Sequence, residues 1–370
     1  MRQRLNRLVL NVVAALVAAL FAAGITSVIL ALRGNSPTFV ISQMWKYGTQ
    51  AGSEVTILNS ATVYYFSAVA VAIGFRMNLF NIGVDGQYRL AAMFAGAFGG
   101  SVALPNGLRQ VATILVAMLV GAMWAGLVAL LKVTRGVSEV ISTIMLNFVA
   151  TGLIAYLMRT SNFGHLSGSD VTTKPIPKSG QVGGLSLIPS AGVKVYGLII
   201  LAAIVGVVFH VVVNHTRFGF DLRAAGRSAS AAAASGVNVK RMIVVSLLLS
   251  GATAGLVGMP ILLGDSHSYS SITFQTGLGF TGIAIALLGR NNPVGIAFAA
   301  VLWAFLDQSA QILDLNNIPK EIIQITQGVV VLSVVVAYEL VRRFALVRQQ
   351  RAVGRALAAP AAPATQAASA

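Results

Sequence analysis

Polar side chains interrupt an apolar stretch at residues 75–89, which read FRMNLFNIGVDGQYR. Four of them offer hydrogen-bonding groups: Asn78, Asn81, Asp85 and Gln87. Glycine lets a backbone leave helical geometry, and Gly83 and Gly86 lie among these residues. Non-helical backbone at membrane depth is tolerated only inside protein or beside a water-filled cavity. We therefore expect a broken segment beside a substrate pathway. The alternative is an ordinary turn in which Asp85 caps the following helix.

Two aromatic residues precede this segment, and a few carboxylates are scattered in other apolar runs. Tyr64 and Tyr65 belong to the apolar run before it, and we expect them to contact substrate together with the amides. Glu139, Asp307 and Glu339 are ionisable residues within other apolar runs. Asp307 either lines a pore or pairs with a neighbour. A proton-driven carrier more often shows a chain of buried carboxylates and histidines, and the sequence shows none.

Several kinds of chemistry are excluded by what the sequence lacks. There is no cysteine, so disulfides, thiol catalysis and cysteine-based metal sites are impossible. The histidines show no metal-ligand spacing, and no catalytic motif of the GxSxG or HExxH type occurs. No GxxxxGK[ST] motif occurs either, so ATP hydrolysis must come from a partner. We expect no catalytic residue, no metal and no cofactor, and a chain that is not an enzyme.

Small side chains dominate a second polar segment, residues 218–242, FGFDLRAAGRSASAAAASGVNVKRM. It is too polar to lie in lipid, and a short helix with so little bulk can lie in a groove on a partner protein. This predicts a docking segment for a separate motor subunit. The alternative is a solvated loop with an alanine helix. The expected contact residues are Arg223, Gly226, Arg227, Ala229, Ala232, Ala233 and Gly236.

Composition predicts the elements that position these segments. Charged residues make up 10% of the 370 residues, against about 25% in a soluble domain. A membrane span needs about 20 apolar residues, so we expect an all-α membrane protein with about ten spans. The net charge of +16 does not indicate nucleic-acid binding, because the basic residues flank apolar runs. The expected spans are 8–32, 54–75, 87–104, 109–131, 137–158, 195–213, 242–263, 278–289, 294–312 and 322–341.

The distribution of basic residues predicts a cytoplasmic N-terminus, and the even number of spans then places the C-terminus inside as well. Residues 1–341 would form the transmembrane domain, with an outer connection at about 159–194 and the docking segment within a cytoplasmic connection at about 214–241. Residues 342–370 would form a cytoplasmic tail, first basic and then rich in Ala and Pro, which we expect to be disordered.

Glycines in the second half predict close helix packing and a further break. Gly251 and Gly255 form a GxxxG pair and Gly258 follows, a pattern that lets helices approach closely. Residues 278–289 are too few for a full crossing, so they form either a half-helix or part of a tight turn. Spans 2–5 and 7–10 would start on opposite sides, which is compatible with an inverted repeat containing broken helices.

Four segments together resemble the permease subunits of bacterial ABC importers in the branched-chain amino acid/ribose permease superfamily, and most closely its nucleoside and simple-sugar permeases. These segments are FRMNLFNIGVDGQ, RAAGRSASAAAASGVNVKR, SGATAGLVG and GFTGIAIALLGRNNPVG. The resemblance covers most of the chain apart from both termini and residues 159–194. It implies a permease subunit that translocates nucleosides across the bacterial cytoplasmic membrane, with the second of these segments as the coupling helix.

The resemblance also implies partners: a cytoplasmic ATPase, a second permease that is identical or homologous, and an extracytoplasmic substrate-binding lipoprotein. Membrane lipid would surround the spans, and no nucleic acid is involved. Three rivals remain at this point. One is a simple-sugar permease of the ribose or galactose kind, and another is an ion-coupled secondary carrier. The third is a membrane-embedded enzyme, which would need a catalytic cluster that the sequence does not show.

Overall fold

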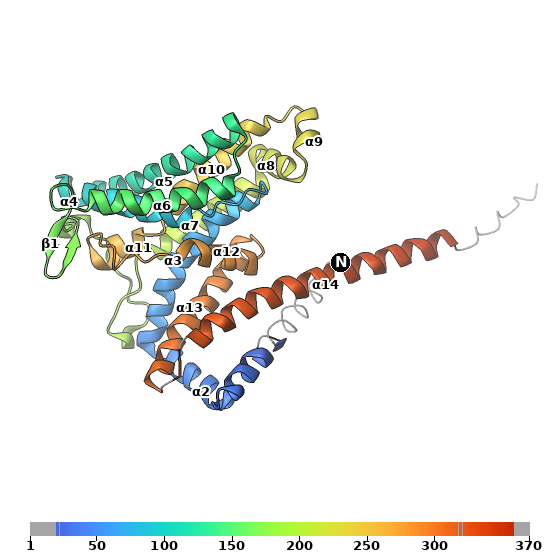
Figure 1. Ribbon diagram of the computed structural model, residues 1–370, viewed down its shortest axis with the longest axis horizontal. Coiled ribbons are helices and arrows are strands. Elements are labelled where there is room, and N and C mark those ends of the chain that lie inside the picture. Colours follow the sequence, from blue (N-terminus) through green and yellow to red (C-terminus); the bar gives the residue numbers. More distant parts are fainter. Residues whose placement is uncertain (1–19, 22, 317, 320, 359–370) are drawn as a thin grey trace, which may run out of the picture. The chain divides into compact units, whose positions relative to one another are not determined.

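The computed structural model describes residues 20–21, 23–316, 318–319 and 321–358, and almost all of its regular structure is helical. Figure 1 shows the order of the elements along the chain. The helices of 12 or more residues are α2 (Pro37–Gly48), α3 (Ala51–Phe75), α4 (Val84–Ser101), α5 (Leu108–Arg135), α6 (Glu139–Leu157), α7 (Ile199–His215), α10 (Val239–Gly255), α13 (Pro293–Leu315) and α14 (Glu321–Ala358). The shorter elements are β1 (His165–Ser167), β2 (Asp170–Thr172), η1 (Lys178–Gly180), η2 (Pro189–Ala191), α8 (Arg217–Arg227), α9 (Ala229–Ala234), α11 (Met259–Ile261), η3 (Leu262–Ser266) and α12 (Leu278–Leu288).

The chain divides into two compact units. The larger one comprises Thr38–Ile323 and contains every segment singled out above except the two termini. The smaller one combines the N-terminal segment with the chain from Gln324 onward. Within it, the Thr26 hydroxyl donates a hydrogen bond to the Thr326 hydroxyl at 3.1 Å, which joins the helical segment Ala23–Leu32 to α14.

In the larger unit, α3 is mostly buried, whereas α5 and α6 expose most of their apolar residues. Figure 1 shows α5 running beside α10, and α6 packs against α4 and α5. The helices α10, α12 and α13 all pack against α3. Because apolar side chains that no protein covers must face lipid, α5 and α6 belong at the periphery and α3 at the centre of a membrane protein.

The predicted all-α membrane class is confirmed. Within the described residues, five helical stretches are long and apolar enough to cross a membrane, namely α3, α5, α6, the run Val239–Ser266 and α13. A sixth is possible if α7 and α8, which meet at an angle of 72°, count as one span. Residues 8–19 of the expected first span lie outside the described part. The total of ten spans and the inverted repeat stay predictions.

The boundaries differ from the expected ones in two places. The expected tenth span ends at residue 341, but α14 continues to Ala358, so the basic stretch 342–355 is helical; residues 359–370 lie outside the described part. The connection 159–194 is also more ordered than its Gly, Ser and Pro content indicates. Its strands β1 and β2 form an antiparallel hairpin with Leu166 opposite Val171, and Leu185 bridges to Val195.

Candidate functional site

A cavity of about 580 Å³ lies beside the N-terminal half of α3; we call it the α3 cavity. Its walls come from α3, from the connection before α7, from α11 and η3, and from the connection that leads from η3 into α12. Apolar walls are provided by Val55, Val63, Ile261 and Leu278. Hydrogen-bonding groups are provided by Thr56, Asn59, Ser60, Tyr64, Lys194, Tyr196, Asp265, Thr273 and Gln275. A concave site of this size with mixed walls suits a small polar solute.

Asn59 fastens the connection before α7 to α3. Its side-chain amide donates to the carbonyl oxygen of Lys194 at 3.3 Å, and its side-chain oxygen accepts from the backbone N–H of Tyr196 at 2.7 Å. The Tyr196 hydroxyl lies near the Asp265 carboxylate, which lines the same cavity. Burial first, and then this carboxylate, raise the pKa of Tyr196 to about 12, so the phenol stays neutral and can donate.

Of the six residues predicted to line a substrate pathway, Tyr64 alone lines the α3 cavity. Its hydroxyl donates to Asp307 of α13 at 2.6 Å, so Asp307 pairs with a neighbouring helix. Tyr65 is buried and points elsewhere, with its hydroxyl against Gly206 of α7. Asn78 is exposed in the turn after α3 and adopts a left-handed conformation, with φ of 58°.

Asn81 and Gln87 form a closed, buried network. The Asn81 amide donates to Gln87 Oε1 at 2.9 Å and to Ser250 Oγ at 2.8 Å, while Asn81 Oδ1 accepts from Gln87 Nε2 at 3.0 Å and from the N–H of Gly83 at 3.1 Å. Ser250 belongs to α10 and donates onward to the carbonyl of Ala70 in α3. Because Asn81 is only 1% exposed and its polar atoms are all engaged, the network holds three helices together and does not face the α3 cavity.

Asp85 caps a helix, but not its own. The N-cap of α4 is Gly83, and Asp85 is the second residue of that helix, within its first turn. Its carboxylate accepts from the N–H of Gly277 at 2.7 Å and lies against the next two backbone N–H groups, at the start of α12. A carboxylate is favourable at a helix N-terminus because the unpaired N–H groups and the helix dipole attract it. The two polar breaks, after α3 and before α12, therefore meet at Asp85.

The helix α12 has 11 residues and ends in a turn of two left-handed residues, Arg290 and Asn291, before α13 begins at Pro293. Its length is about half of a full crossing. The guanidinium of Arg76, at the end of α3, donates to the carbonyl of Asn291 in this turn and lies 5.9 Å from the ring centroid of Phe209. Burial first, and then the nearby Arg223 guanidinium, lower the pKa of Arg76.

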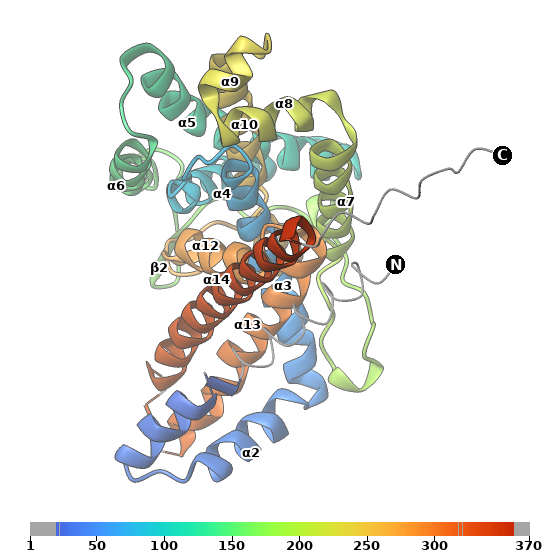
Figure 2. The same ribbon diagram turned by 90° about the vertical axis from the view of Figure 1, so that its right-hand side faces the viewer.

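The predicted docking segment folds into α8 and α9, at one end of α10 (Figure 2). Thr216 and Ser228 cap these helices, each accepting a bond from a backbone N–H. Leu222, Ala225 and Ala232 are buried in a cluster with Met77, Leu79 and Met242, so Ala232 points inward.

Gly226 also lies on the inner side of α8. A Cβ atom there would lie 2.8 Å from the carbonyl oxygen of Arg76 and 2.9 Å from backbone atoms of Met77. The backbone of α8 therefore rests directly on the turn after α3. Arg223 is half-buried on the same side. The remaining predicted contact residues are exposed, namely Arg227, Ala229, Ala233 and Gly236. Among the seven, these four form the accessible surface, which we call the α9 face.

The predicted packing glycines lie at close helix contacts. In α10, a Cβ atom on Gly251 would lie 2.4 Å from the carbonyl oxygen of Gly121, and one on Gly255 would lie 2.1 Å from that of Ala117, both in α5. Gly258 faces Ala92 and the ring of Phe274. Backbones this close leave no room for side chains, so α5 and α10 approach as GxxxG helices do.

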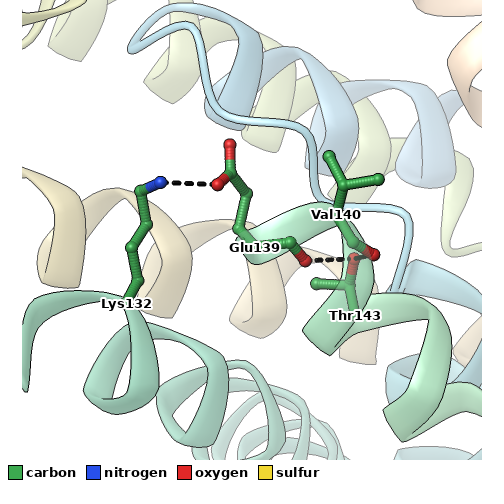
Figure 3. Close-up of polar contacts among 4 residues, drawn as sticks. All are labelled: Lys132, Glu139, Val140 and Thr143. Atoms are coloured by element: carbon green, nitrogen blue, oxygen red, sulfur yellow. Dashed lines mark hydrogen bonds and ion pairs between the residues drawn. The ribbon is translucent and has the colours of Figure 1, made fainter. Parts of the chain in front are cut away.

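Figure 3 shows how the short connection between α5 and α6 is held. Lys132 Nζ lies 2.5 Å from Glu139 Oε2, and the Thr143 hydroxyl donates to the carbonyls of Glu139 at 2.7 Å and Val140 at 3.0 Å. The contact with Lys132 pairs the charge of Glu139 locally. Neither residue of this ion pair lines the α3 cavity.

Sequence reasoning missed most of the α3 cavity. Asn59, Lys194, Tyr196 and Asp265 lie in three separate segments that only the folded chain brings together. One signal was available, because Asp265 directly follows the apolar run after Gly258 and is adjacent to Gly264. No cluster of three or more potential metal ligands occurs in the part of the chain that the structure describes.

Known proteins are similar to this sequence over most of its length. Residues 54–337 match the family described as the permease component of the branched-chain amino acid transport system. The guanosine ABC transporter permease protein NupP of Bacillus subtilis is 32% identical over 92% of this chain and 96% of its own. The glucose ABC transporter permease protein TsgB13 of Haloferax volcanii is 31% identical, over 78% of this chain and 77% of its own.

A third relative, the nucleoside ABC transporter permease protein NupB of Lactococcus lactis, is 27% identical over 74% of this chain and 76% of its own. No solved structure matches the chain significantly. The family match covers well over half of the chain, and NupP is similar along nearly the whole of it. The chain therefore belongs to the branched-chain amino acid transport system permease component family.

Proposed function

We propose that this chain is the membrane-spanning permease subunit of an ATP-driven importer that translocates nucleosides. The observation that carries this proposal is the similarity to the guanosine permease protein NupP over 92% of the chain. The α3 cavity supports it, because hydroxyl, amide and carboxylate groups beside apolar walls suit a solute with a polar sugar and a flat base. The route would pass along α3, from the α3 cavity toward the break at residues 76–83.

The energy would come from a cytoplasmic ATPase that binds the α9 face. Small side chains make this surface shallow, so a groove on the partner can enclose the short helix. Arg227 adds positive charge at its edge. Ala232 is excluded from this contact by its burial, and Gly226 by its position against the turn after α3.

Gly226 would transmit movement of the bound ATPase to the substrate route. It joins α8 to Arg76 and Met77, and Arg76 is bonded to the turn that separates α12 from α13. A shift of α8 therefore acts on α3 and on the half-length helix α12 together. Alternating access requires that kind of movement in segments beside the route.

The remaining partners follow from the same proposal. Both termini would lie in the cytoplasm and the connection 159–194 outside. A substrate-binding lipoprotein would deliver nucleoside to the outer face, where the α3 cavity lies under residues 184–196. A second permease, identical or homologous, would complete the transport complex within the bacterial cytoplasmic membrane.

A sugar is the second candidate substrate, because the glucose permease protein TsgB13 is 31% identical over 78% of this chain. The test uses the complex of permease, ATPase and binding protein in proteoliposomes. Radiolabelled guanosine should accumulate only with ATP inside the compartment that holds the ATPase, and labelled glucose should not. Accumulation of glucose alone would favour the sugar alternative. Uphill uptake without ATP would contradict the proposal and favour an ion-coupled carrier.

A further inference from the structure

The most distinctive group in the α3 cavity is the carboxylate of Asp265. It belongs to η3, a five-residue π-helix that follows α11. Short π-helical segments are rare and frequently occur at functional sites. The residue that follows η3, His267, is a non-glycine residue in the left-handed region, with φ of 54°. Such a conformation is costly and persists only where the surrounding structure enforces it.

The surrounding structure holds Asp265 firmly in the cavity wall. Leu262 and Leu263 anchor η3 because both are fully buried. The carbonyl of His267 accepts from the N–H of Ile176 at 2.7 Å, and the Ser266 hydroxyl donates to the carbonyl of Ile261 at 3.2 Å. The Asp265 side chain itself remains exposed. A fixed backbone with an open carboxylate is the arrangement expected of a preorganised ligand-binding group.

The Asp265 carboxylate has accepting capacity left over. An ionised carboxylate offers about four lone-pair sites. The Tyr196 hydroxyl is the neighbouring group that can use one of them, and no basic residue forms an ion pair with Asp265 in the described chain. Two neighbouring hydroxyl groups of a ligand can bond to the two oxygens of a carboxylate side by side, and bonds to a charged acceptor are the stronger kind. In nucleotide-binding folds an acidic residue binds ribose hydroxyls by the same chemistry.

We propose that Asp265 binds the vicinal diol of the transported solute, which in a nucleoside is the 2′,3′-diol of ribose. Tyr196 positions the carboxylate, and the ring of Tyr64 lies in the same cavity, where a base would fit. The inference rests on the proposed function for the identity of the solute. The chemistry it names, a pair of adjacent hydroxyls, is also present in sugars.

The test compares guanosine with 2′,3′-dideoxyguanosine in the reconstituted complex, for the wild type and for Asp265→Asn. The binding protein is the same in both, so its own preference cancels when the two variants are compared. Asparagine is neutral and keeps only one acceptor. We expect uptake of guanosine to fall about tenfold or more, and uptake of the dideoxy compound to change by less than about twofold. Asp170→Asn, in β2 and outside the cavity, should change neither.

Direct binding to the detergent-purified permease–ATPase complex gives a second measurement that does not need the binding protein. The wild type should bind guanosine about tenfold more tightly than the dideoxy compound, and Asp265→Asn should remove that difference. Equal losses for both solutes, or equal wild-type affinities, would overturn the diol assignment while leaving the proposed function intact.

Failure of the diol assignment and failure of the proposed nucleoside substrate give different results. A wild-type complex that imports glucose but not guanosine contradicts the proposed nucleoside substrate. In that case the same comparison is made between glucose and 3-deoxyglucose, which lacks both the 2,3-diol and the 3,4-diol. Loss of discrimination in Asp265→Asn would then assign the diol site to a sugar, and unchanged discrimination would reject the site altogether.

Discussion

Gly226→Ala should weaken the coupling of ATP hydrolysis to uptake while leaving the ATPase bound. The added Cβ atom would lie 2.8 Å from the carbonyl oxygen of Arg76 and 2.9 Å from backbone atoms of Met77, where ordinary contacts begin at 3.4 Å. Backbone atoms cannot rotate aside, so α8 must withdraw by about half an ångström. Overpacking of this kind costs about 2–3 kcal/mol, the upper part of the usual range, because the three nearest atoms all belong to the backbone. Alanine gains about 1 kcal/mol over glycine in a helix, which offsets part of that.

The net cost, roughly 1–2 kcal/mol, corresponds to about a 5- to 30-fold lower population of the arrangement in which α8 rests on the turn after α3. Guanosine uptake in proteoliposomes should fall by a similar factor, while the amount of ATPase that copurifies and its basal hydrolysis stay unchanged. Gly152→Ala in α6 is the matched control, because nothing lies within 4 Å of its Cβ position. Normal uptake by Gly226→Ala would refute the transmitting role. Loss of ATPase binding would instead indicate that Gly226 is part of the docking surface.

Three further substitutions test separate parts of the structure. Ala233→Trp on the exposed α9 face should abolish copurification of the ATPase without lowering the thermal unfolding temperature of the permease, and retained binding would contradict the docking surface. Asn81→Ala removes the bonds that Asn81 makes to the buried Gln87 amide and to the N–H of Gly83, so unfolding in detergent should become easier by about 1–3 kcal/mol; an unchanged unfolding temperature would mean that the network is not structural. Gly255→Leu places a side chain where the carbonyl of Ala117 already lies, so little monodisperse protein should be recovered on size exclusion; normal recovery would contradict the close α5–α10 contact.

The helical membrane class could be predicted because it depends on composition and on the length of apolar runs, which the sequence displays directly. The short helix at 278–288 was also visible as an apolar run too brief to cross. The direction of individual side chains in the docking segment was not visible. Ala232 and Ala233 are chemically identical neighbours, and only the path of the chain at Ser228 turns one inward and the other outward.

The polar segment at 75–89 illustrates a different limit. Its amides and carboxylate are rare in an apolar setting, but that rarity does not distinguish groups available to a solute from groups that bond to other parts of the chain. In the structure Asn81 and Gln87 form hydrogen bonds with each other, and Asp85 accepts a hydrogen bond at the start of α12. Each of those partners is determined by contacts between residues far apart in sequence, such as the 192 positions that separate Asp85 from Gly277. Long-range pairing of this kind leaves no local pattern, and for the same reason the walls of the α3 cavity could not be assembled from the sequence.

The bond between Asp85 and the start of α12 ties the first half of the chain to the second. If α12 tilted alone, its first N–H groups would lose their acceptor and a buried carboxylate would lose its donors, which costs several kcal/mol inside a protein. The less costly motion carries α4 and α12 along as one rigid pair. Reorientation of the route is therefore expected to occur by sliding of this pair against its neighbours, with the hydrogen bond intact in both the inward-open and the outward-open form.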